Sequence, residues 1–114
     1  KTVGVNTMKQ ESKLSVLIRV EPGSLGPDGL EQVEKFCLLC QRIFNDNGNL
    51  FWQVEPRYDK SLPEISYFVN GMMLNDDKAR RLFSAHALDC DEIEEQAMDE
   101  ISKLIDRFLG HEYK

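Results

Sequence analysis

Three cysteines and one histidine are the side chains whose types could support metal or redox chemistry. Cys37 and Cys40 form a C-x-x-C motif, and His86 and Cys90 lie four residues apart further along the chain. Four such side chains match the ligand inventory of a structural zinc site. A redox cysteine, in contrast, lies at a helix N-terminus, where the dipole lowers its pKa. Because the periodicity puts Cys37 and Cys40 in mid-helix, we expect core packing and neither metal nor cofactor, with zinc as the alternative.

Other catalytic patterns are absent from the sequence. It contains no G-x-S-x-G nucleophile elbow and neither of the glycine-rich motifs that bind nucleotides. Carboxylates are plentiful, but nothing in the sequence indicates a cleft in which two of them would share acid and base roles. We therefore expect a protein that is not an enzyme.

A block of carboxylates near the C-terminus is the most distinctive charged feature. Residues 89–100 hold seven acidic side chains and no basic one. Such a block is typical of a solvated helix face. The alternative is a docking face that steers a basic protein partner. The candidate contact residues are Asp91, Glu94, Glu95, Asp99 and Glu100.

The overall charge limits the class of partner. The formal net charge of −6 disfavours nucleic acid and anionic membranes, because both require clustered Lys and Arg. No apolar run approaches the ~20 residues that span a bilayer. The odd number of cysteines, three, is no disulfide framework, so we expect a reducing, cytoplasmic location.

Four segments carry the pattern of β-strands. Residues 14–21 alternate between apolar and other side chains, and residues 50–55 and 65–69 are rich in β-branched and aromatic residues. Asn70-Gly71, between two apolar runs, predicts a tight hairpin and therefore a short strand at 72–74.

Three segments carry the 3.6-residue periodicity of helices. The first begins at Asp28, which could cap it, and closes at Asn47-Gly48. The second begins at Asn75 or Asp76, and the third runs from Asp89 to Gly110. The apolar stripe expected to bury the first helix comprises Leu30, Val33, Phe36, Cys37, Cys40, Ile43 and Phe44.

These elements predict an α+β fold. The order β-α-β-β-(β)-α-α favours a two-layer sandwich, with an antiparallel sheet of three or four strands and the helices on one face. The chain fits a single domain, 1–114, with a folded part at 14–110 and a flexible segment at 1–13. We expect Met8 to be the natural start and the residues before it to be foreign to the native protein.

Aromatic side chains are expected on both faces of the sheet. Phe51 and Phe68 alternate away from the apolar stripes of their strands, so they should lie on the face that the helices leave open. We interpret that face as a homodimer interface. The alternative is a pocket between sheet and helices near Trp52, Tyr58 and Tyr67, which would suit a small-molecule-binding protein or a small enzyme.

The order of elements also offers a resemblance. A β-α-β-β-α order, a proline-containing loop before the first helix and an acidic C-terminal helix are similar to the DinI family of DNA-damage regulators. The resemblance implies docking through the acidic helix, as that family docks on a recombinase. This chain differs by one extra C-terminal helix.

Three functional hypotheses follow from the sequence. The first is a small, acidic, non-enzymatic interaction or regulatory protein that forms a homodimer and also binds a basic protein. The second is a binder or enzyme acting on a small molecule in the pocket just described. The third is an immunity or antitoxin protein that neutralises a basic partner.

Overall fold

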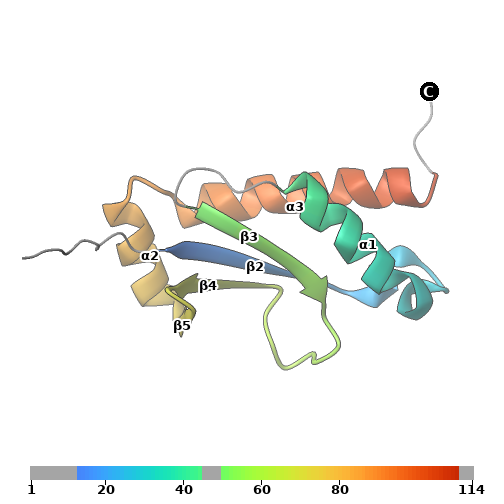
Figure 1. Cartoon of the computed structure of the whole chain (residues 1–114), viewed down its shortest axis with the longest axis horizontal. Helices are drawn as coiled ribbons and strands as arrows, with labels where there is room; N and C mark the ends of the chain where they lie inside the picture. Colours follow the sequence, from blue (N-terminus) through green and yellow to red (C-terminus); the bar gives the residue numbers. More distant parts are fainter. Residues whose placement is uncertain (1–12, 45–49, 111–114) are drawn as a thin grey trace, which may run out of the picture.

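The computed structural model describes residues 13–44 and 50–110, and its elements follow the expected order (Figure 1). The α+β class and the order β-α-β-β-β-α-α are confirmed. The flexible segment expected at 1–13 lies almost wholly outside the described residues, as does the helix end expected at Asn47-Gly48. The elements are β2 (Leu14–Val20), the 3-10 helix η1 (Pro22–Leu25), α1 (Gly29–Ile43), β3 (Leu50–Pro56), β4 (Ile65–Val69), β5 (Met72–Leu74), α2 (Asp76–Ala85) and α3 (Cys90–Phe108).

The sheet is mixed, so the prediction of an antiparallel sheet is wrong in one respect. Its strand order is β3-β2-β4-β5, and β3 runs parallel to β2 while β4 and β5 are antiparallel to their neighbours. The physical reason is α1. A helix between two adjacent strands returns the chain to the end of the sheet where it began, which makes the pair parallel.

All three helices cover one face of the sheet. The side chains of Leu14, Val16, Ile18 and Val20 point from β2 into a single core that includes buried residues of α1, α2 and α3. In Figure 1, α1 and α3 lie over the sheet. The helix α2 lies beside β5, at the end of the sheet that is far from α1. None of the described helices is long and apolar enough to cross a membrane.

The β4–β5 hairpin has the turn that its sequence predicts. Asn70 and Gly71 both have positive φ, 51° and 85°, as a two-residue type I′ turn requires. Val69 then pairs with Met72. Asn70 also fastens the hairpin to β2, because its N–H donates to the Lys13 carbonyl and its Oδ1 accepts from the Lys13 N–H, both at 2.8 Å.

The helix starts are capped in two cases out of the three that the sequence suggests. The Asn75 side chain accepts from the Lys78 N–H, and the Asp89 side chain accepts from the Asp91 N–H. Asp28 makes no such side-chain bond at the start of α1. The expected break between α2 and α3 is present, and Ala87, with φ of 63°, makes the turn.

A side chain of α1 forms hydrogen bonds with the backbone at the outer edge of β3. Gln41 Nε2 donates to the Trp52 carbonyl and Gln41 Oε1 accepts from the Val54 N–H, each at 2.8 Å. One amide thus satisfies two backbone groups that would otherwise invite another strand. Edge-to-edge pairing at β3 is therefore blocked by the fold itself.

Candidate interaction surfaces

The four potential metal ligands do not gather. Cys37 and Cys40 are buried in α1, and burial raises the pKa of each thiol to about 12. Cys90 is buried at the start of α3, whereas His86 is exposed at the end of α2. Over residues 13–44 and 50–110, no group of three or more His, Cys, Asp or Glu is placed to hold a metal ion. The buried thiols are protonated near neutral pH and act as small apolar core residues.

Two carboxylates of the acidic block are paired within the molecule. Asp91 Oδ1 lies 2.9 Å from Nη2 of Arg80, an ion pair that joins α3 to α2. Asp99 lies 3.2 Å from Nζ of Lys103 on the next turn of α3. These pairs neutralise much of the charge that these positions would offer to a partner.

A third carboxylate of the block faces the core. The Tyr67 hydroxyl donates to Glu94 Oε2. Glu94 and Glu100 are half-buried, whereas Asp91, Glu95 and Asp99 are exposed, the two aspartates as members of ion pairs. The structure therefore engages three of the five candidate carboxylates, Asp91, Glu94 and Asp99, in contacts within the molecule.

The three aromatic residues expected around a pocket lie in different places. Tyr67 is buried in the core, where its ring packs edge-on against Phe83 at 5.1 Å between centroids. Trp52 packs on Phe44 at 5.2 Å beside the C-terminus of α1. Tyr58 is exposed in the loop after β3. The structure therefore does not bring the three together around a common hollow.

The face of the sheet opposite the helices carries one row of side chains across all four strands. The register pairs Ser15 with Phe51 on one side and with Phe68 on the other, and it pairs Phe68 with Met73. Phe51 and Phe68 thus lie on the face predicted for them, flanking a small residue. We call Phe51, Ser15, Phe68 and Met73 the sheet row.

Charged groups on this open face contact other groups of the molecule, although the buried Nε of Arg19 has no hydrogen-bond partner among the described residues. Buried Arg19 donates through Nη1 to the Pro63 carbonyl at 2.8 Å and to Ser66 Oγ at 2.7 Å, and its Nε lies 3.9 Å from Glu55. The Lys13 ammonium lies 4.7 Å above the ring of Phe51. The open face is therefore apolar along the sheet row and close to neutral beside it.

A second apolar surface runs along α1, where the sequence did not predict one. Leu30 and Leu38 are 73% and 70% exposed, and Tyr58 beside them is 55% exposed. Leu30 therefore does not belong to the buried stripe to which its periodicity assigned it, and Ile43 is also exposed. The signal available in the sequence was Leu38, which lies off that stripe and eight residues from Leu30.

Two hollows flank Tyr58 along this surface, and we call them together the α1 groove. One, of about 420 Å³, lies between Leu30, Tyr58 and the η1 segment. The other, of about 320 Å³, lies between Leu38, Tyr58 and Pro56. Glu34 lines the smaller hollow, where the Tyr58 hydroxyl donates to its Oε2 at 3.1 Å.

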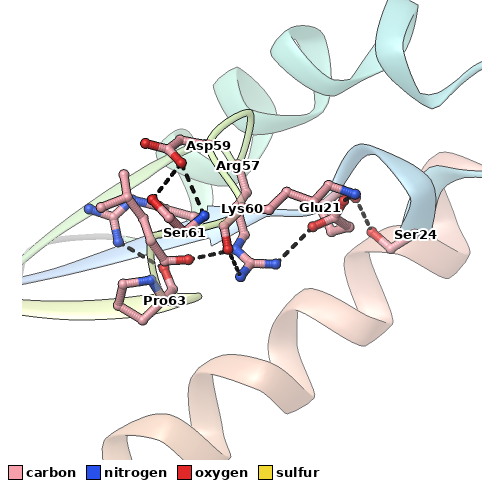
Figure 2. A network of polar contacts seen from close by, with 9 residues as sticks. Glu21, Ser24, Arg57, Asp59, Lys60, Ser61 and Pro63 are labelled. Atoms are coloured by element: carbon pink, nitrogen blue, oxygen red, sulfur yellow. Dashed lines mark hydrogen bonds and ion pairs between the residues drawn. The ribbon is translucent and has the colours of Figure 1, made fainter.

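The wall of the α1 groove is held by a polar network (Figure 2). The Arg57 guanidinium donates to Glu21 at 3.0 Å and to the carbonyls of Leu62 and Lys60 at 2.9 and 3.1 Å. The ammonium of Lys60 also pairs with Glu21, and together with Arg57 it lowers the pKa of that carboxyl. The loop after β3 is thereby fastened to the end of β2.

Comparison with known proteins returns no relative of this chain. It matches no protein-family model, no curated protein and no solved structure.

Proposed function

We propose that the protein is a non-enzymatic interaction protein that pairs with a second copy of itself through the open face of its sheet. The observation that carries this proposal is the sheet row. It crosses every strand of the sheet, and its members alternate in size across β3, β2 and β4, from Phe51 to Ser15 to Phe68. An apolar strip of this kind on a sheet face that no helix covers is typical of a protein interface.

The sheet row is complementary to itself. A two-fold axis parallel to the strands, midway between two facing sheets, places β2 of one copy over β4 of the other and β3 over β5. Phe68 then meets the partner's Ser15, and Phe51 meets the partner's Met73. Each large ring faces a small or flexible side chain, as interdigitation between packed sheets requires.

The distribution of charge favours the same face. Residues 75–114, which include α2 and α3, carry 11 of the 20 acidic groups but only 6 of the 14 basic ones. Two copies that met through α3 would bring like charges together. Copies that meet through the sheet row keep their acidic helices on opposite outer sides, which lowers the repulsion between them.

The size of the contact sets the expected strength. Four strands spaced ~4.8 Å apart and up to ~23 Å long give a face smaller than the ~800 Å² per partner of a standard interface. We therefore expect a dimer that dissociates on dilution in the micromolar range.

Sedimentation velocity over a range of protein concentrations tests this pairing. The wild type should shift from monomer to dimer as concentration rises, and both Phe68→Asp and Met73→Asp should remain monomeric. Met98→Asp, a matched change on α3, should dimerise like the wild type. Met73 is 54% exposed, so its variant keeps the test valid if Phe68→Asp unfolds. A monomeric wild type, or variants that dimerise normally, would overturn the proposal.

The setting that we propose is the reducing cytoplasm. The structure keeps three free cysteines buried, which suits a compartment where disulfides do not form. The charge of −6 disfavours nucleic acid and anionic membranes as partners and is compatible with a basic protein partner.

A further inference from the structure

We propose that the α1 groove binds a segment of a basic partner protein, one that carries two apolar side chains about 12 Å apart with a Lys or Arg between them. This inference goes beyond the pairing through the sheet row. It uses a different surface of the molecule and a different occupant.

The spacing of the apolar anchors comes from α1. Leu30 and Leu38 are eight residues apart, which is about 12 Å along a helix with a rise of 1.5 Å per residue. Each leucine borders its own hollow, and Tyr58 borders both. An occupant therefore needs one apolar side chain at each end.

The apolar lining continues behind the leucines. Pro22 and Pro27 line the larger hollow, and Val54 and Pro56 line the smaller one. Burying two leucines that are about 70% exposed removes their apolar surface from water, which favours binding. That gain is the main source of affinity for this site.

The charge between the anchors comes from Glu34. Its carboxylate accepts one hydrogen bond from Tyr58, and it remains exposed beside the smaller hollow, midway between Leu30 and Leu38 along α1. A carboxylate has room for further donors, and an ammonium or guanidinium provides the strongest. Glu34 therefore selects a basic side chain at the middle of the occupant.

The same residue disfavours a second copy of this chain in the register that matches the two leucines. A two-fold axis that placed Leu30 against the partner's Leu38 would pass beside Glu34 and bring two identical carboxylates into contact. Like charges placed opposite one another at an interface disfavour that pairing. We therefore assign the site to a different protein.

The groove is formed before anything binds. Arg57 and Lys60 hold the loop that carries Tyr58 against Glu21 (Figure 2). On the other side, η1 packs so closely on α1 that a Cβ on Gly29 would lie 1.8 Å from the Pro22 carbonyl oxygen. Fixed walls reduce the entropy lost on binding.

A displayed library of random 16-residue peptides, selected on the full-length protein, tests the proposal. Selected peptides should share two apolar anchors flanking a Lys or Arg. Synthetic copies, measured by fluorescence anisotropy, should bind Leu30→Asp and Leu38→Asp at least tenfold more weakly than the wild type. Met72→Asp, which changes a 67% exposed apolar residue on β5, should bind them normally.

Charge reversal separates the role of Glu34 from a general loss of structure. Glu34→Lys should weaken the same peptides at least fivefold, and a peptide with Glu at its central position should regain affinity for this variant. Tyr58→Phe, which removes the hydrogen bond but keeps the carboxylate, should change affinity less than threefold. Selection of no peptide, peptides without the basic residue, or binding unaffected by Leu38→Asp would overturn the proposal. None of these outcomes bears on the dimer formed through the sheet row.

Discussion

The outer face of α3 and the open face of the sheet were both candidates for contact, and the structure treats them differently. On α3, Asp91 and Asp99 are paired with basic side chains and Glu94 with a tyrosine of the sheet. On the sheet, Phe68 and Met73 point away from every helix. On α3, several charged groups form contacts with other residues of the chain. On the sheet, apolar side chains lie on a face that no helix covers.

The difference shows that charge density along a sequence does not by itself tell which charged groups are engaged within the fold. A surface ion pair contributes at most about 1 kcal/mol, but it still occupies the group that a partner would need. An exposed apolar side chain, in contrast, can be removed from water only by burial, either in the core or against a partner. We therefore base both proposed contacts on exposed apolar side chains rather than on the run of carboxylates.

Neighbouring residues on opposite faces of β4 give the largest predicted contrast. Tyr67→Ala removes a ring buried against Phe83 and should lower the free energy of unfolding by about 3–5 kcal/mol. Phe68→Ala should cost only about 1–2 kcal/mol, because this ring is partly exposed. Urea denaturation of both variants, well below the dimerisation range, measures the difference. Equal losses would mean that the open face is as closely packed as the core.

The hydrogen bonds of Gln41 to the edge of β3 predict a smaller loss of stability. The same variant separates dimerisation through the sheet face from pairing through the strand edge. Gln41→Ala removes the two hydrogen bonds from Gln41 to the Trp52 carbonyl and the Val54 N–H and should cost about 1–2 kcal/mol. The matched change Gln96→Ala on the exposed side of α3 should have little effect. If dimerisation through the sheet face is correct, Gln41→Ala should keep the original dimer. It should also form assemblies larger than the dimer, through the edge of β3 that Gln41 no longer covers. Loss of that dimer in Gln41→Ala would place the contact at the β3 edge instead.

The smallest predicted effect concerns the acidic helix. Tyr67→Phe removes the donor to Glu94 and should cost about 1 kcal/mol, whereas Glu95→Gln should change stability by less than about 0.5 kcal/mol. A double-mutant cycle of Tyr67→Phe with Glu94→Gln should give a coupling energy of the same order as the first loss. A coupling energy of zero would show that Glu94 is not used by the fold and is free for a partner.

The elements themselves could be predicted from the sequence. Alternation placed β2 within one residue of its observed end, and Asn70-Gly71 fixed the β4–β5 turn because both residues tolerate positive φ. The direction of β3 was missed because strand periodicity carries no information on direction. The helix between β2 and β3 did carry it, since such a crossover makes the two strands parallel.

The surfaces were predicted less well, for a related reason. Periodicity predicts which face of a helix is apolar. It does not predict how much of that face the sheet or another helix will cover. Leu30 was assigned to the buried stripe of α1, yet the sheet covers only the side occupied by Val33, Phe36 and Cys40. The pairing of Glu94 with Tyr67 joins residues 27 apart in the chain, and no local pattern indicates it.

Disulfide trapping across the sheet row tests the central claim most directly. The proposed two-fold axis places Ser15 of one copy against Phe68 of the other, and the three native cysteines are buried and so give little background. A mixture of Ser15→Cys and Phe68→Cys proteins, mildly oxidised, should form a linked heterodimer much faster than either variant alone. A mixture of Ser102→Cys with Phe68→Cys should not. Equal rates in all samples, or no cross-link at concentrations where the protein sediments as a dimer, would contradict the account.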